Sequence, residues 1–167
     1  MDALTAVKKG LWTLPLEQRQ EIYRDLRQVL GLSEQEPLLP LPEPALRAWC
    51  QRFAALLAPK LAQHPTTRNM ADTTRIESML LVYGQRPDDA FFESHVVAGT
   101  RLLNGGLPGL YLHVLLNGIA VPIARQAARE VLTPEQAALI EERYSGLMLL
   151  RHALLQEVGL GTGGVVS

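Results

Sequence analysis

The sequence predicts an all-α protein of six or seven helices. Apolar residues recur every three to four positions along most of the chain, and no run alternates between apolar and polar residues as a half-buried strand would. Prolines and glycines separate the periodic segments. The 167 residues, 47% of them hydrophobic, suffice for one domain with an apolar core.

The N-terminal part predicts an amphipathic helix and an extended connector. The helix is expected from Pro15 to Leu30, with Gly31 as its end. Its apolar face would be formed by Leu16, Ile22, Leu26, Val29 and Leu30. Residues 33–44 carry four prolines, a density that neither a helix nor a central strand accepts. We expect this connector to be a linker or a strap across the core.

Three helices are predicted in the middle of the chain. One spans residues 45–63, with Pro59 expected to bend or divide it. The next runs from Asp72, a candidate N-cap, to Gly84. A third begins at the acidic turn of residues 87–89 and ends at Asn104-Gly105-Gly106.

The C-terminal part predicts two further helices and a tail. Pro108 suits the first turn of a long apolar helix that reaches Ile123. Residues 133–136, Thr-Pro-Glu-Gln, resemble a capping box that opens a final helix ending near Glu157. Residues 159–167 are glycine-rich and predict a flexible tail or the start of a linker.

Composition argues against several classes of function. Sixteen basic and 17 acidic residues give a formal charge of -1, which favours neither nucleic acid nor a membrane surface as partner. Cys50 is the single cysteine and is expected to be a buried structural thiol. No signal peptide and no uninterrupted membrane-spanning segment is recognisable. We therefore expect a soluble cytoplasmic protein.

Candidate catalytic and metal-binding residues are few. The four histidines are scattered and form no pair with metal-ligand spacing. The adjacent pairs Asp88-Asp89 and Glu141-Glu142 cannot converge on a substrate from a helix, and Ser94-His95 lacks a nucleophile elbow. We expect no metal site and no enzymatic activity.

Residues 87–111, PDDAFFESHVVAGTRLLNGGLPGLY, resemble the signature of sensor globins, the globin domains of globin-coupled sensors and protoglobins. Gly99 and Gly106-Leu107-Pro108 match the glycines and the proline around the family's proximal haem histidine. The resemblance implies a globin-like domain at residues 45–158, preceded by an N-terminal helical extension at 1–32 and the connector at 33–44.

In this register the family's two polar haem contacts are missing. Leu102 stands at the position of the proximal histidine, and an alkyl side chain cannot coordinate iron. Ala58 stands about where the family often has a distal tyrosine. The resemblance therefore implies a haem-less variant without a cofactor. Two alternatives remain open: His95 or His113 could bind iron in a shifted haem, or Leu102 could be a core leucine of an unrelated helical bundle.

The resemblance implies a non-enzymatic sensor that passes a signal through a helical homodimer to an output domain or partner, such as a diguanylate cyclase, a kinase or a stressosome-type protein. An apolar pocket would suit a fatty-acid-like ligand; its candidates are Ala58, Ile76, Met79, Tyr83, Leu102, Leu107 and Tyr111. The candidates for the dimer interface are Tyr111, Leu115, Ile119, Tyr144, Met148 and His152. A plain interaction scaffold is the remaining alternative.

Overall fold

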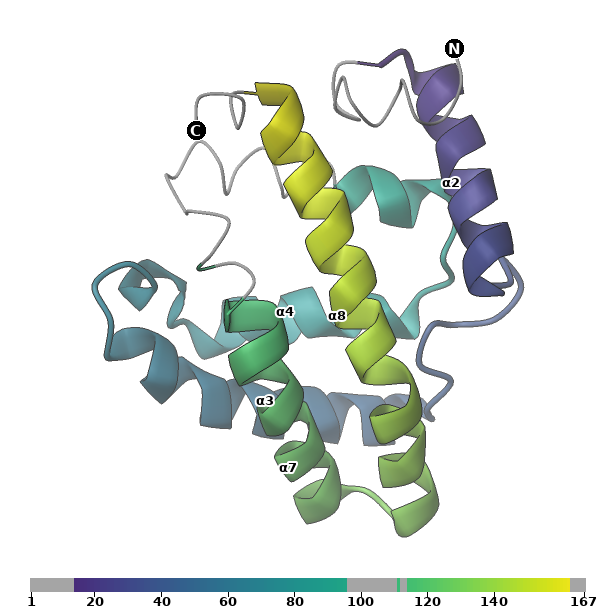
Figure 1. The fold of residues 1–167 in the computed structure, drawn as a ribbon. Coiled ribbons are helices and arrows are strands. Elements are labelled where there is room, and N and C mark those ends of the chain that lie inside the picture. Colours follow the sequence, from purple (N-terminus) through teal and green to yellow (C-terminus); the bar gives the residue numbers. More distant parts are fainter. Residues whose placement is uncertain (1–13, 96–110, 112–113, 163–167) are drawn as a thin grey trace. The chain divides into compact units, whose positions relative to one another are not determined.

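The computed structural model describes residues 14–95, 111 and 114–162, with side chains as far as Met148 (Figure 1). All regular structure among these residues is helical, as predicted. Residues 89–95 are also helical. The helices are α2 (Leu16–Leu30), α3 (Glu43–Ala62), η2 (Arg68–Met70), α4 (Thr73–Leu81), η3 (Val82–Gly84), η4 (Val114–Ala120), α7 (Val121–Val131) and α8 (Pro134–Thr162).

Three predicted helix ends are confirmed by their hydrogen bonds. Gly31 ends α2 in the left-handed conformation, with φ of 65°. Asp72 caps α4, because its Oδ1 accepts from the Arg75 N–H at 3.2 Å. At the start of α8, Thr133 Oγ1 accepts from the Gln136 N–H, and Gln136 Oε1 accepts from the Thr133 N–H. These short-range signals therefore fix where α2 ends and where α4 and α8 begin.

Helix α3 differs from its prediction at both prolines. It begins at Glu43, because Pro44 lies in the first turn, where a missing N–H costs no hydrogen bond. It also runs through Pro59 as one helix to Ala62. Pro59 and the residue four positions before it, Ala55, are both exposed, so the carbonyl that loses its partner faces water.

The C-terminal helices are longer than predicted. The helix expected to end at Ile123 continues as α7 to Val131. The last helix, expected to end near Glu157, reaches Thr162, so residues 159–162 are helical rather than part of a tail. The predicted helix start at Pro108 lies outside the described residues.

Contacts between Cα atoms divide the chain into two compact units. The first holds residues 1–36, 86–112 and 150–167, and the second holds residues 37–85 and 113–149. Residues 134–149 of α8 belong to the second unit, and residues 150–162 belong to the first.

An aromatic cluster forms the core of the second unit. The ring of Trp49 in α3 meets the rings of Phe53 and Tyr144 edge-on, each at a centroid distance of 5.5 Å. Tyr83 also contacts Tyr144 edge-on, at 6.1 Å. The Trp49 indole N–H donates to the carbonyl of Ala124 in α7 at 3.1 Å. The cluster therefore ties α3 to α7 and α8.

Cys50 is buried, as predicted. Its side chain is only 1% exposed in α3. Burial raises the pKa of the thiol to about 12, so the protonated form persists at neutral pH. Cys50 therefore packs as a small apolar residue.

The proline-rich connector forms a strap on the second unit. The Leu38 N–H donates to the Gln85 carbonyl at 3.1 Å, and the Leu39 N–H donates to the Tyr83 carbonyl at 2.8 Å. Leu38 and Leu39 are buried, while Pro40 beside them is exposed. These hydrogen bonds and the burial of both leucines hold this part of the connector against residues 83–85.

Candidate functional site

The predicted pocket residues are only partly assembled in the described chain. Ala58 in α3, Ile76 in α4 and Tyr83 in η3 are buried in the second unit. Met79 is 44% exposed, although α4 itself packs against α3. Tyr111 is 40% exposed and is assigned to the first unit. Leu102 and Leu107 lie outside the described residues.

Ala58 is buried in α3, which packs against α4. Leu57 and Leu61 are buried beside it on α3, and Ile76 and Leu80 are the buried residues of α4. The buried hydroxyl of Thr67, in the turn that joins these helices, donates to the Leu61 carbonyl at 2.8 Å. Ala58, at the position where the sensor-globin register expects a distal tyrosine, is therefore a buried residue without a polar side chain.

The predicted dimer residues fall into two groups. Leu115, Tyr144 and Met148 are buried within the single chain, where Tyr144 belongs to the aromatic cluster. Ile119 is partly exposed, and Tyr111 is exposed. The side chain of His152 lies outside the described residues. Any dimer face on these helices would therefore have to use residues other than the three buried ones.

His95 is the most enclosed of the described histidines. It is 5% exposed, and its Nδ1 lies 2.9 Å from the Phe91 carbonyl, one turn earlier in the helix. The Phe91 ring packs against it at a centroid distance of 4.4 Å. His64 is exposed, and its Nδ1 accepts from the Thr66 N–H. His113 lies outside the described residues.

A stripe of three α2 side chains contacts the helix of residues 89–95. Arg19, Tyr23 and Arg27 are spaced by four residues and share one face of α2, which we call the α2 stripe. The Arg19 guanidinium binds both carboxylate oxygens of Glu93, with Nε to Oε1 at 2.7 Å. Tyr23 donates its hydroxyl to the same Glu93 oxygen at 2.9 Å. Glu93 thus receives three hydrogen bonds from two turns of α2.

An aromatic stack completes this contact. The ring of Tyr23 lies parallel to that of Phe92 at a centroid distance of 4.9 Å, and both residues are fully buried. Burial, together with the hydrogen bond to Glu93, raises the pKa of the Tyr23 hydroxyl above its usual range. Tyr23 therefore remains a donor to Glu93 at any ordinary pH.

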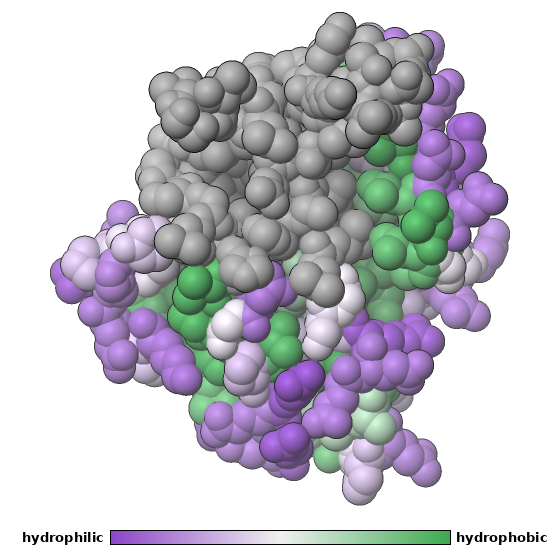
Figure 2. Space-filling model, viewed as in Figure 1, coloured by the Kyte–Doolittle hydropathy of each residue, from purple (hydrophilic) through white to green (hydrophobic). Residues whose placement is uncertain are grey.

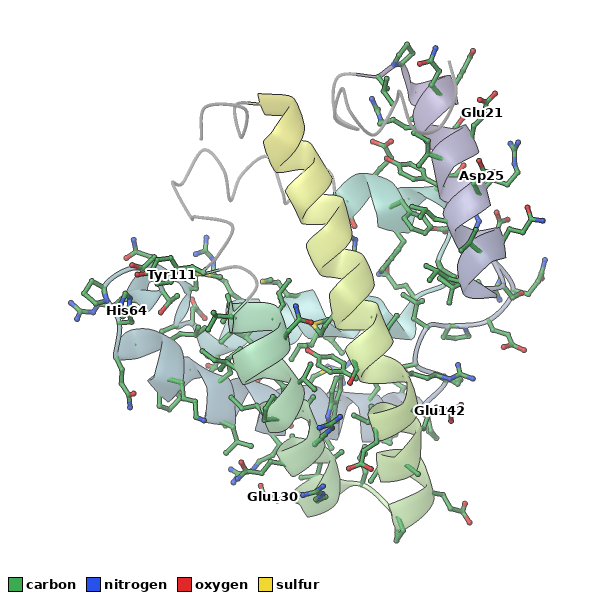
Figure 3. The ribbon with its side chains drawn as sticks, in the orientation of Figure 1. Glu21, Asp25, His64, Tyr111, Glu130 and Glu142 are labelled. Atoms are coloured by element: carbon green, nitrogen blue, oxygen red, sulfur yellow. The ribbon has the colours of Figure 1, made fainter. Side chains whose placement is uncertain are left out.

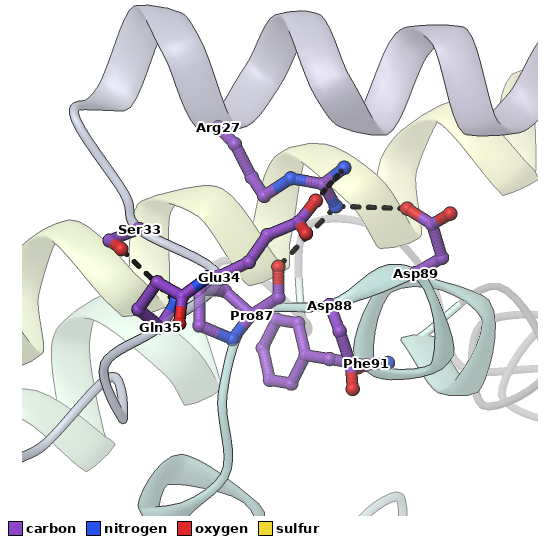
Figure 4. Close-up of polar contacts among 8 residues, drawn as sticks. All are labelled: Arg27, Ser33, Glu34, Gln35, Pro87, Asp88, Asp89 and Phe91. Carbon is purple, nitrogen blue, oxygen red and sulfur yellow. Dashed lines mark hydrogen bonds and ion pairs between the residues drawn. The ribbon is translucent and has the colours of Figure 1, made fainter.

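Arg27 lies at the C-terminal end of the α2 stripe and contacts the turn after α2 and residues 87–89 (Figure 4). Its guanidinium contacts Asp89 Oδ1 at 2.9 Å, Glu34 Oε1 at 2.7 Å and the Pro87 carbonyl at 3.4 Å. It also lies over the ring of Phe92, 5.7 Å from the centroid. The side chain of Arg27 is only 8% exposed. This buried charge therefore joins α2 to the turn after it and to the start of the helix of residues 89–95.

The α2 stripe was not predicted, because the expected contact face of α2 was drawn from its apolar residues alone. Of the predicted apolar face, Ile22 is buried, but Leu16, Val29 and Leu30 are 49%, 82% and 47% exposed. The charges carry a signal for this contact. Arg19 and Arg27 are eight residues apart, Asp89 and Glu93 are four residues apart, and the first cation pairs with the second anion, as in two segments that run in opposite directions. Glu21 and Asp25 lie on the opposite side of α2 and are exposed (Figure 3).

The other charged contacts of the described chain are mostly at the surface. Arg52 pairs with Glu130, and Arg129 pairs with Glu141 at 3.1 Å. The hydrogen bond from Arg52 lowers the pKa of Glu130. Among the residues that the structure describes, no group of three or more His, Cys, Asp or Glu side chains could hold a metal ion. Over the same residues, no helix combines the length and apolarity needed to cross a membrane.

The coloured part of the surface in Figure 2 is mainly hydrophilic, with separate hydrophobic areas. The exposed large apolar residues of the described chain are spread over several helices: Leu16, Val29, Leu30, Met79, Tyr111, Val114 and Val131.

Comparison of the chain with protein-family models, curated proteins and solved structures finds no match. The likeness to sensor globins therefore stays a prediction.

Proposed function

We propose that this protein is a non-enzymatic, haem-less globin-like regulatory domain that responds to an apolar ligand or a partner. The observation that carries the proposal is the burial of Ala58 in α3, whose side chain offers no hydrogen-bonding group, together with the aliphatic buried residues of α4, Ile76 and Leu80. A polar ligand or a bound oxygen molecule would need a hydrogen-bonding group there, whereas an acyl chain needs none. The ligand class we propose is therefore a fatty acid or a similar amphiphile.

The charged groups of the described chain support a regulatory rather than a catalytic role. The buried Arg27 pairs with carboxylates from its own unit, and Glu93 is held by Arg19 and Tyr23. These contacts join helices, and each of the carboxylates is engaged by an arginine or by the Tyr23 hydroxyl. In this proposal a homodimer passes the signal to an output domain or partner, and α8, which has segments in both units, is the element that would transmit it.

Ala58→Gln tests the ligand class. Wild-type protein is expected to enhance the fluorescence of cis-parinaric acid in a saturable titration. Light scattering tests the homodimer separately and is expected to give twice the mass of one chain. The glutamine amide would enter a buried position without a partner, so we expect weaker binding and a loss of about 1–3 kcal/mol in the free energy of unfolding.

Ala55→Gln is the matched control for Ala58→Gln. Ala55 is exposed on the same helix, so its replacement should change stability by less than about 0.5 kcal/mol and leave the fluorescence titration unaltered. Wild-type protein that shows no saturable binding would contradict the fatty-acid ligand. Equal effects of the two replacements would contradict the buried position of Ala58.

A haem-binding gas sensor is the second candidate, and one contact favours it. The Nδ1 of His95 lies 2.9 Å from the Phe91 carbonyl. A backbone carbonyl that accepts from Nδ1 fixes the tautomer whose Nε2 carries the lone pair, which is the arrangement found in histidines that ligate metals. Haem ligation by His95 would need a rearrangement that exposes this 5% exposed side chain to the iron.

His95→Ala and His113→Ala decide between the two candidates. If haem binds through either side chain, added haem gives a saturable Soret band that the corresponding variant abolishes. We expect no such band in wild-type protein. His64→Ala is the control, because His64 is exposed and its ring accepts a hydrogen bond from its own turn.

A further inference from the structure

The segment before α7 is wound as a π-helix. Residues Val114–Ala120 form η4, which continues directly into α7, and Figure 1 draws the two as one rod. A π-helix pairs each N–H with the carbonyl five residues earlier and usually extends over a single turn. A seven-residue π-helix that joins an α-helix therefore needs a local cause.

The order of two leucines and one asparagine supplies this cause. In a π-helix, the residues on the same face as Ala120 are those four and five positions before it, which are Leu116 and Leu115. In an α-helix they would be three and four positions before it, which are Asn117 and Leu116. The π register thus turns two leucines toward the core, whereas the α register would replace Leu115 by Asn117.

Burial along η4 follows the π register. Leu115, Leu116 and Ala120 are buried, Asn117 is half-buried, and Val114 and Gly118 are exposed. Burial of an aliphatic side chain is favourable, and burial of an amide costs free energy unless its hydrogen bonds are remade. The register is therefore chosen by which side chain enters the core.

Because of Pro122, α7 does not impose its α-helical register on η4. Pro122 is the second residue of α7 and has no N–H to donate to the carbonyl of Gly118, the acceptor in an α-helix, or of Asn117, the acceptor in a π-helix. The hydrogen bond that would carry the α register of α7 into the preceding turn is missing in both cases. The two registers consequently differ mainly in the positions of Leu115 and Asn117.

We propose that η4 is a two-register element that converts between the π form and an α form. The α form turns Asn117 toward the core in place of Leu115. A ligand or partner that satisfies or displaces the Asn117 amide would select one register. That last step rests on the proposed regulatory function, whereas the two registers are a property of the free chain.

Exchanging the two side chains tests the register. In the double variant Leu115→Asn/Asn117→Leu the composition is unchanged, but the α register now buries two leucines. We expect NOEs between α and amide protons five residues apart in wild-type η4, and four residues apart in the variant. In wild-type protein, relaxation dispersion at the amides of residues 114–121 should also report microsecond-to-millisecond exchange. The ratio of α to π populations should rise by about tenfold or more in the variant.

Gly118→Ala is the matched control. A Cβ at this exposed position would meet only Val114 Cγ1, at 3.8 Å, so the replacement does not alter which side chain faces the core. It should therefore retain the five-residue NOEs. A wild-type η4 without exchange, or a double variant that keeps the π pattern, would overturn the proposal. If the double variant does not fold, Asn117→Leu alone is the second test: both registers then bury two leucines, so the α population should rise above that of wild type, and an unchanged π pattern would count against the proposal. None of these measurements depends on ligand or dimerisation, so failure here is distinct from failure of the proposed function.

Discussion

Replacement of Trp49 by alanine is expected to lower the free energy of unfolding by about 3–5 kcal/mol, the range typical of a truncated core aromatic residue. The indole is fully buried and meets Phe53 and Tyr144 edge-on. Its N–H is also the donor for the Ala124 carbonyl, which would lose that partner. Urea unfolding followed by circular dichroism measures the loss.

Two further replacements separate packing from the hydrogen bond at Trp49. Trp49→Phe keeps an aromatic ring but removes the donor to Ala124, and we expect a loss of about 1–2 kcal/mol. Val131→Ala, at a 40% exposed position, is the surface control and should change stability by less than about 0.5 kcal/mol. If Trp49→Ala were no more harmful than Val131→Ala, the aromatic cluster would not be the core of the second unit.

Replacement of Arg27 by alanine is expected to destabilise the first unit by about 2–3 kcal/mol, near the lower end for a broken buried ion pair. Asp89, Glu34 and the Pro87 carbonyl would lose their shared partner, but the side chains of Asp89 and Glu34 are 39% and 56% exposed. Water therefore compensates part of the loss. Arg27→Lys keeps the charge, but its single nitrogen cannot occupy the positions of both Nη1, which contacts Asp89, and Nη2, which contacts Glu34, so an intermediate loss is expected.

Arg47 provides the comparison for Arg27. It pairs with Glu43 four residues earlier on α3, with side chains 57% and 79% exposed. Such a surface pair is worth about 0–0.5 kcal/mol, so Arg47→Ala should be nearly neutral in urea unfolding. A result for Arg27→Ala as small as that for Arg47→Ala would show that the α2 stripe does not hold the helix of residues 89–95.

Local sequence signals predicted three helix ends, those at Gly31, Asp72 and Thr133, because the interactions that set them are short-range. Asp72 lies three residues from the N–H that it caps, and Thr133 and Gln136 bond each other across the same distance. Gly31 ends α2 because glycine adopts positive φ without strain. The all-α class follows from the same three-to-four-residue periodicity.

The features that sequence analysis missed depend on distant residues. The contact face of α2 is decided by Glu93 and Asp89, about seventy positions further along the chain, and not by the apolar residues of α2 itself. The π register of η4 depends on a core that other helices complete. Of the predicted pocket residues, Ala58, Ile76 and Tyr83 are buried and Met79 is 44% exposed, and the pocket itself stays a prediction.

Absorbance of the wild-type protein during a haem titration tests the central proposal most directly. With no ligating side chain at residue 102, we expect the spectrum of free haem at every ratio and no saturable Soret band. A saturable band at one haem per chain, lost in His95→Ala or His113→Ala but kept in His64→Ala, would contradict the haem-less proposal and establish the haem-binding alternative.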